Sequence, residues 1–170
     1  MAESLEERVA RLEARIEELE DDRAIRELLA RYAYNADGCR DEAYVQLYTE
    51  DGAMDLSGGQ GNIRRWQGHE ALREFITDTT GHQAPGFYGR AMHVQGNNVV
   101  THIKGDDAIV NSYSIVLAGD PSGGPKISLF SAGNNQWTLK KQAGKWLIKE
   151  RRRRHIGDDW YITNLEATPE

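Results

Sequence analysis

The sequence predicts a single α+β domain in which helices come first and a strongly curved antiparallel sheet follows. Three observations support this prediction. Most apolar residues before residue 80 fall at helical spacing, and residues 92–155 form β-rich runs separated by turn residues. The chain has 170 residues with 39% hydrophobic content, enough for one core but not for a second full domain. A curved sheet covered on one side by helices leaves a cavity between the layers, which is a natural ligand site.

A helix is predicted at the N-terminus from the seam of a short coiled coil. Its apolar residues follow one another at steps of four and three: Leu5, Val9, Leu12, Ile16 and Leu19. Glutamate and arginine occupy most positions between them. Such an amphipathic helix either lies on its own domain or contributes to a subunit interface. The pair Asp21-Asp22 interrupts the seam, and a helical stripe then continues from Ile25 to Tyr32 and ends near Asp37-Gly38.

Two more helices and a short strand are predicted in the first half of the chain. The helices cover residues 41–48 and a segment that starts at residue 68 and ends near residue 81. Between them, residues 49–52 are typical of a turn and residues 53–56 of a short strand. The glycine-rich stretch 57–61 lacks the Gly-Lys-Ser/Thr ending of a phosphate-binding loop, so we interpret it as a flexible turn.

The second half of the chain is predicted to be a meander of strands that begins after a loop at residues 83–90. The β-rich runs are residues 92–94, 98–101, 108–116, 128–140 and 145–155. Turn residues separate the later runs at 104–107, 119–125 and 142–145.

Composition limits the partners and the compartment that we expect. A formal net charge of −6 argues against general binding to nucleic-acid phosphates. The N-terminus has no apolar signal core and no window is apolar enough to span a bilayer, so neither secretion nor membrane insertion is expected. The single cysteine, Cys39, cannot form an internal disulfide, and a cytoplasmic location is the expectation. The histidine spacing predicts no metal site.

Tyr32, Asp37 and His93 are the candidate catalytic residues. Tyr32 and Asp37 lie five residues apart at a predicted helix end, so they can share one rim, and His93 opens the first long strand. A histidine oriented by a carboxylate can take a proton from carbon or return one to a leaving oxygen. A phenol could polarise a carbonyl or protonate the leaving group. On spacing alone, Asp37 also fits an ordinary helix end and His93 a satisfied strand histidine.

Residues 151–155 form a run of four arginines and a histidine at the end of a predicted strand. Because side chains alternate along a strand, two arginines point to each face. Either one pair is solvated or bridges to acids at a subunit contact, or Arg153 or His155 reaches the cavity mouth and binds an anionic or carbonyl oxygen.

The aromatic residues are expected in the core or the cavity wall, and some of them should define an apolar substrate pocket. The candidate substrate-binding residues are Tyr48, Trp66, Tyr113, Phe130 and Arg153. Three other histidines, His69, His82 and His102, are expected to be solvated surface groups.

A set of short motifs extends over residues 5–157. They are Glu6-Glu7-Arg8-Val9, Ala24-Ile25-Arg26-Glu27-Leu28, Arg31-Tyr32, Asp37-Gly38, Leu47-Tyr48-Thr49-Glu50-Asp51-Gly52, Gly68-His69-Glu70-Ala71-Leu72, Met92-His93-Val94 and Gly144-Lys145-Trp146-Leu147-Ile148. Together they resemble the SnoaL-like branch of the nuclear-transport-factor-2-like superfamily. The likeness within it is closest to the bile-acid 7α-dehydratase group, with scytalone dehydratase and hexachlorocyclohexane dehydrochlorinase more distant.

This resemblance implies a cone-shaped fold around a pocket, no metal or organic cofactor, and a homotrimer or homodimer. Asp37 and His93 match the positions of the family's acid/base dyad, and Tyr32 matches its assisting tyrosine. The expected organisation is a helical extension at residues 1–20, the SnoaL-like domain at 21–157 and a tail at 158–170. The arginine run and residues 119–125 have no counterpart in the dehydratase pattern, so the substrate can differ.

The sequence and the resemblance together predict a cofactor-independent lyase of the dehydratase type, acting on a small hydroxylated cyclic or aromatic substrate. The same dyad could serve carbon–carbon cleavage with loss of formaldehyde, an isomerisation or a cyclisation, because each begins with the same proton transfer. A non-catalytic module that binds a small hydrophobic ligand is the alternative from another class.

Overall fold

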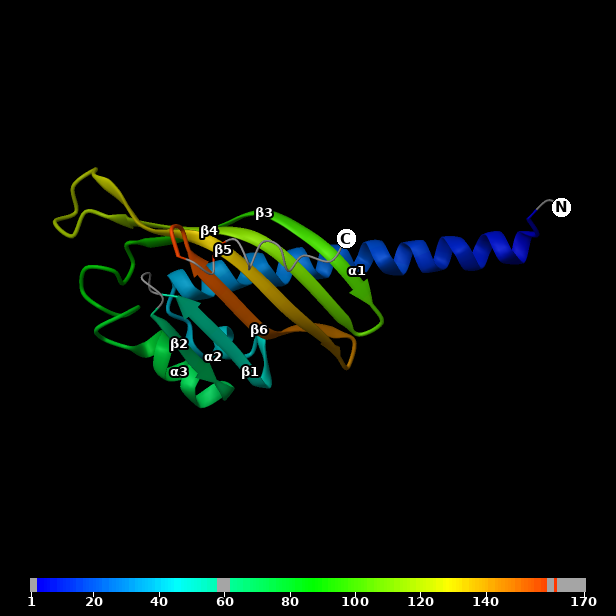
Figure 1. The fold of residues 1–170 in the computed structure, drawn as a ribbon, viewed down its shortest axis with the longest axis horizontal. Helices are drawn as coiled ribbons and strands as arrows, with labels where there is room; N and C mark the ends of the chain where they lie inside the picture. The colour runs from blue at the N-terminus through cyan, green and yellow to red at the C-terminus, as the bar shows by residue number, and fades with distance from the viewer. Residues whose placement is uncertain (1–2, 58–61, 159–160, 162–170) are drawn as a thin grey trace.

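The computed structural model describes residues 3–57, 62–158 and Tyr161. It has the predicted α+β class: helices pack against one face of a curved, unclosed sheet (Figure 1). Most of the predicted flexible turn at 57–61 and of the predicted tail at 158–170 lies outside the described residues.

Helix α1 (Leu5–Asp37) is one continuous helix of 33 residues. Ser4 starts it with a capping box, in which the Ser4 hydroxyl accepts from the Glu7 N–H and the Glu7 carboxylate accepts from the Ser4 N–H. The helix passes through Asp21-Asp22 without a break, because two acidic residues alter the apolar stripe but not the backbone hydrogen bonds.

The two halves of α1 have different environments. The second half is buried against the sheet through Ile25, Leu28, Leu29, Tyr32 and Ala36. The first half extends beyond the sheet (Figure 1), and its seam residues are exposed: Leu5, Val9, Leu12, Ile16 and Leu19. The prediction that this segment lies on its own domain is therefore wrong, and the subunit-interface alternative stays a prediction.

The segment after α1 departs from the prediction in two places. Helix α2 (Asp41–Val45) is shorter than expected, because Tyr48 begins strand β1 (Tyr48–Ser57), which absorbs the predicted turn at 49–52. Strand β2 (Ile63–Gln67) was not predicted, and most of its side chains are exposed. An edge strand of this kind lacks the alternation of buried and exposed residues that would reveal it.

Helix α3 (Gly68–Thr77) follows β2 directly and ends at Thr77 rather than near Gly81. A loop then leads to β3 (Ala91–Lys104), β4 (Asp107–Gly119), β5 (Ile127–Gln142) and β6 (Lys145–His155). The two runs predicted at 92–94 and 98–101 form one strand, β3.

The six strands are arranged in the order β2-β1-β6-β5-β4-β3. Neighbouring strands are antiparallel except β1 and β6, which pair in parallel. The sheet is therefore mixed, whereas the sequence predicted an antiparallel sheet. The parallel pair joins two segments far apart in the chain, and no local pattern predicts such a crossover. Register shifts in β3, β4 and β5 bend these long strands, and the bends curve the sheet toward the helices.

The core lies between the helices and the inner face of the sheet. Its largest fully buried side chains are Trp137, Tyr32, Tyr44, Tyr48, Ile25, Leu29, Met54, Leu72, Ile76, Leu139, Ile148 and Val45. Within the described ranges, no helix combines the length and the apolar composition needed to cross a bilayer.

We expect the substitution Gly133→Ala to destabilise the fold by about 2 kcal/mol or more, because it overpacks the contact between β5 and β6. A Cβ at Gly133 would lie 2.1 Å from the carbonyl oxygen of Arg154, a backbone atom of the paired strand. Urea unfolding of the purified variant measures this loss. The matched control is Gly96→Ala in β3, where a Cβ meets nothing within 4 Å. Equal losses in the two variants would contradict the prediction.

Candidate active site

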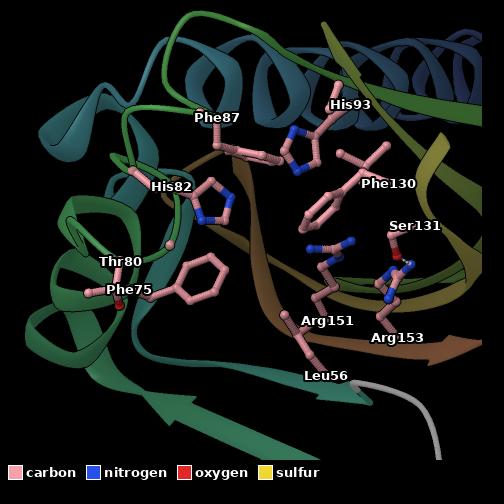
Figure 2. Close-up of a pocket in the computed structure, with 15 residues that line it drawn as sticks. Leu56, Phe75, Thr80, His82, Phe87, His93, Phe130, Ser131, Arg151 and Arg153 are labelled. Carbon is pink, nitrogen blue, oxygen red and sulfur yellow. Dashed lines mark hydrogen bonds between the residues drawn. The ribbon is translucent and has the colours of Figure 1, made fainter. Parts of the chain in front are cut away.

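A cavity of about 420 Å³ lies between the inner face of the sheet and the loop that follows α3. Most of its wall is apolar, and the polar groups that reach it come from four different elements (Figure 2). The lining residues are Leu56, Phe75, Thr80, Gly81, His82, Ala84, Gly86, Phe87, His93, Val116, Ala118, Phe130, Ser131, Arg151 and Arg153.

Asp37 and His93 form a joined carboxylate–imidazole pair at one side of this cavity. The Nδ1 atom of His93 lies 2.6 Å from Oδ1 of Asp37, and the backbone N–H of His93 donates to the same oxygen at 2.9 Å. An ionised carboxylate can only accept, so Nδ1 carries the proton in this contact and Nε2 is left as the basic nitrogen. The side chain of His93 is 7% exposed and that of Asp37 is 23% exposed.

The pair is built where the end of α1 meets the start of β3. Asp37 is the last residue of the helix, where the helix dipole disfavours a negative charge. Two hydrogen bonds from the backbone and ring of His93 offset this cost. The arrangement fixes both the position of the imidazole and its tautomer.

His82 stacks on His93, with ring centroids 5.6 Å apart and ring planes 9° from parallel. Phe75 and Phe87 contact the edges of His82 at 4.5 Å and 5.6 Å between centroids. Burial is the main cause that lowers the pKa of His82 to about 4, and electrostatic interactions with the neighbouring His93 and with the cation of Arg151 add to it. His82 is therefore a neutral imidazole at neutral pH, in contrast to the predicted solvated surface group.

Arg151 enters the cavity wall from β6 and is 3% exposed. Its Nη1 donates to the hydroxyl of Tyr32, and its Nε donates to Oδ1 of Asn135 at 3.0 Å. The guanidinium carbon lies 4.9 Å from the ring centroid of Tyr32 and 5.1 Å from that of Trp137. These contacts hold a buried cation through hydrogen bonds and ring faces.

The arginine run alternates between faces as predicted. Arg151 and Arg153 line the cavity, where Arg153 donates to the hydroxyl of Ser131. Arg154 is paired with Asp55 at 2.6 Å, within the same chain. Burial, and then the charge of Arg151, lower the pKa of Arg153 to about 10, so it remains a cation at neutral pH.

Three predicted site residues line the cavity: His93, Phe130 and Arg153. Asp37 lies behind His93 through the contact described above. His155, the predicted alternative to Arg153, is not among the residues that line the cavity. Its Nδ1 lies 2.8 Å from the backbone carbonyl oxygen of Ile156.

Tyr32 and Tyr48 lie in the core and not on the cavity wall. Tyr32 is 1% exposed and reaches the site only through Arg151, while its hydroxyl also accepts from Tyr44 at 3.1 Å. Tyr48 packs beside Tyr44, at 5.7 Å between ring centroids. The helical spacing placed Tyr32 near the end of α1 correctly, but it did not reveal that the side chain packs one layer beneath the wall.

Trp66 and Tyr113, also predicted to bind substrate, are not among the residues that line the cavity. Trp66 packs against Phe75, at 4.8 Å between ring centroids, and so stands behind the wall. Tyr113 is exposed on the outer face of β4, because the residues on either side of it, Ser112 and Ser114, are buried on the inner face.

Sequence reasoning missed His82, Ser131 and Arg151 as cavity residues. Strand alternation could have identified Arg151, since it shares a face with Arg153. His82 comes from an irregular loop, and no periodicity predicts where such a side chain points. Among the residues that the structure describes, no cluster of three or more His, Cys, Asp and Glu side chains is placed to hold a metal ion.

Comparison with known proteins agrees with this fold. A family model described as a SnoaL-like domain matches residues 17–152. The chain is similar to a nuclear-transport-factor-2-like protein with a cystatin-like fold from Novosphingobium aromaticivorans, with 27% identity, a TM-score of 0.80, and coverage of 97% of this chain and 99% of that one. No protein in the search of curated proteins matches the sequence.

Two other solved structures are also similar. A protein of unknown function from Mycobacterium tuberculosis has 28% identity and a TM-score of 0.68, with 82% of this chain and 73% of that one covered. A scytalone dehydratase-like protein from Novosphingobium aromaticivorans has 20% identity and a TM-score of 0.66, with 81% and 85% covered. At 20% identity the last likeness shows a common fold alone.

We expect His82 to make the protein less stable in mild acid. Its pKa is about 4 in the folded protein against 6.5 as a free side chain, so between these values the unfolded chain binds a proton that the folded chain does not. The free energy of unfolding therefore falls as the pH drops through this window, by about 2 kcal/mol between neutral pH and roughly pH 5.

The variant His82→Phe tests this expectation, because it keeps an aromatic ring in the stack and removes the titrating group. Its unfolding free energy, measured in urea at the two pH values, should fall by about 2 kcal/mol less than that of the wild type. The exposed residue His102 supplies the control His102→Gln, which should behave as the wild type. The same acid-induced loss in wild type and His82→Phe would contradict the assignment.

Proposed function

The chain belongs to the SnoaL-like domain family, and on that premise we propose that it is a cofactor-independent lyase. The proposed reaction eliminates water, or a similar leaving group, from a small hydroxylated cyclic or aromatic substrate. The observation that carries the proposal is the contact of 2.6 Å between Asp37 and His93 beside a largely apolar cavity.

His93 is the proposed general base. Its Nδ1 is engaged by Asp37, so Nε2 is the nitrogen available to a substrate in the cavity. Nε2 takes a proton from a carbon beside an activating carbonyl, and the carbon–hydrogen electron pair moves toward that carbonyl as an enolate. Asp37 holds the ring and stabilises the imidazolium that forms.

Loss of the leaving group completes the proposed reaction. The enolate electrons re-form the carbonyl and make the new carbon–carbon double bond as the carbon–oxygen bond breaks. The imidazolium of His93 returns its proton to the departing hydroxyl, which leaves as water. The enzyme ends in its starting protonation state, so the balance needs no oxidant or reductant.

Arg151 is the proposed stabiliser of the enolate oxygen. Its guanidinium is a buried cation on the cavity wall, and an oxyanion in such a low-dielectric site gains more from a fixed cation than it would in water. Tyr32 then acts as a positioning residue, because its hydroxyl accepts from Nη1 of Arg151 and its ring lies under the guanidinium. This role replaces direct contact of Tyr32 with the substrate.

The neutral state of His82 favours the same chemistry. A second imidazolium stacked at 5.6 Å on His93 would oppose protonation of the base, whereas a neutral ring does not. The phenylalanines of the wall, Phe75, Phe87 and Phe130, favour a substrate with a flat apolar ring.

We expect His93→Gln to lower the rate of elimination by about 100-fold or more, because it removes the base. Asp37→Asn should lower it by about 10-fold or more, since the imidazole loses the partner that sets its tautomer. The assay incubates the protein with a panel of hydroxylated cyclic ketones and aromatic alcohols and follows loss of water by mass spectrometry. His102→Gln, at an exposed position, is the control and should retain the wild-type rate.

The products separate the alternatives. Loss of formaldehyde would assign the dyad to carbon–carbon cleavage, and a rearranged product of unchanged mass would assign it to isomerisation or cyclisation. Tight binding of panel compounds with no turnover, unchanged in His93→Gln, would overturn the lyase proposal in favour of a small-hydrophobe binding module.

A further inference from the structure

Arg153 is a buried cation without an anionic partner among the described residues. Its side chain reaches the cavity with the residue only 7% exposed, and its one hydrogen-bond partner in the described chain is the hydroxyl of Ser131. A cation buried without an opposite charge costs free energy that a neutral hydroxyl offsets only in part.

The other three arginines of the run show how such a charge is ordinarily balanced. Arg152 lies 3.8 Å from Glu150, and Arg154 lies 2.6 Å from Asp55. Arg151 has two ring faces and two hydrogen bonds. Arg153 lines the cavity beside Ser131 (Figure 2) with that one side-chain hydrogen bond, and among the described residues neither a carboxylate nor an aromatic ring face balances its charge.

We propose that Arg153 and Ser131 form a subsite for a carboxylate carried by an otherwise apolar ligand. The planar guanidinium matches a carboxylate in a two-point contact, and the hydroxyl of Ser131 beside it can supply a further hydrogen bond. The apolar wall formed by Leu56, Val116 and Phe130 accommodates the uncharged remainder of the ligand.

The subsite deepens the proposed function and rests on it, since it states that the carboxylate end of the substrate binds at Arg153 and Ser131. Arg151 and Arg153 are two residues apart on one strand face, a rise of about 6.6 Å. A carboxylate at Arg153 therefore leaves the reacting carbonyl near Arg151, in the cavity that His93 also lines.

Calorimetric titration with cinnamate and its neutral amide, cinnamamide, tests the subsite. We expect the wild type to bind cinnamate at least about 10-fold more tightly than cinnamamide, as for a charge-assisted hydrogen bond in a buried site. Arg153→Gln should abolish this preference, and Arg153→Lys should retain part of it. Arg152→Gln, on the opposite face of the same strand, is the matched control and should bind as the wild type.

Equal affinity for the two compounds in the wild type, or a preference that survives Arg153→Gln in a folded variant, would overturn the subsite. His93→Gln should keep the preference for cinnamate. Failure of the elimination assay thus leaves the binding result intact, and loss of the anion preference leaves the dyad chemistry intact, so the two proposals fail separately.

The exposed first half of α1 carries a second, independent inference. Its five seam residues are between 45% and 77% exposed. At about 100° per residue, this seam lies roughly half a turn from the stripe that packs on the sheet, which runs from Ile25 to Ala36. The domain's own sheet therefore cannot cover it.

We infer that this seam pairs with the same seam of a second copy as a parallel, two-stranded coiled coil. In heptad notation Val9 and Ile16 occupy the a positions, and Leu5, Leu12 and Leu19 occupy the d positions. β-branched residues at a with leucine at d favour two parallel strands over three or four.

The flanking charges point to the same orientation. In a parallel pair, each g residue faces the e residue five positions later in the partner, which matches Arg8 with Glu13 and Arg15 with Glu20. An antiparallel pair would place arginine against arginine and glutamate against glutamate. The helix is already anchored at its second half, so pairing does not need to order it.

Disulfide cross-linking tests both the contact and its direction. Leu5→Cys should form a disulfide-linked dimer under mild oxidation, because residue 5 meets its own copy only in a parallel pair in register. Ala14→Cys, at the exposed f position on the far side of the helix, is the control and should cross-link at least about 10-fold more slowly. Because the two variants are compared with each other, the difference in cross-linking rate reports on the seam even if the protein also associates through another surface. Equal rates for the two variants would overturn the inference.

Discussion

The buried guanidinium of Arg151 is the interaction on which the inside of this domain depends. It ties the hydroxyl of Tyr32 in α1 to the amide of Asn135 in β5 and packs against Trp137. Asn135 and Trp137 in turn both donate to the hydroxyl of Ser112, so the network reaches β4. A buried charge tolerates few arrangements of its neighbours, because each unmet hydrogen bond there is costly. The helix and three strands are thereby held in one relative position.

This fixed arrangement of helix and strands brings Asp37 and His93 together from two distant segments of the chain. Asp37 and His93 are 56 residues apart, and they meet because α1 is anchored on the sheet just before its last turn. The cavity beside them combines apolar and charged walls. In the proposed reaction the phenylalanine rings shape the cavity, His93 is the base, and Arg151 supplies positive charge where negative charge would develop. The low pKa of His82 keeps the stacked ring from adding another cation beside the base.

The long helix serves two surfaces because its apolar stripe changes face. Before Asp21-Asp22 the stripe points away from the sheet, and after it the stripe becomes part of the core. Periodicity predicted both stripes, since helical spacing is local. Periodicity could not show that the first stripe has no partner among the described residues, because that depends on where the sheet ends in space. The prediction that Tyr113 lines the cavity was wrong for a related reason. Its position on a strand was predictable, but the face of the sheet to which its side chain points was not.

The sequence by itself determined the class of fold, the three catalytic candidates and the alternation of the arginine run. Each of these rests on short-range spacing or on motifs that resemble a known family. Only the tertiary structure decided that Tyr32 lies beneath Arg151, that the side chain of His82 lines the cavity, and that β1 pairs with β6 in parallel. These outcomes depend on contacts between segments far apart in the chain. Their energies come from burial and charge in the assembled core, which no local pattern of residues records.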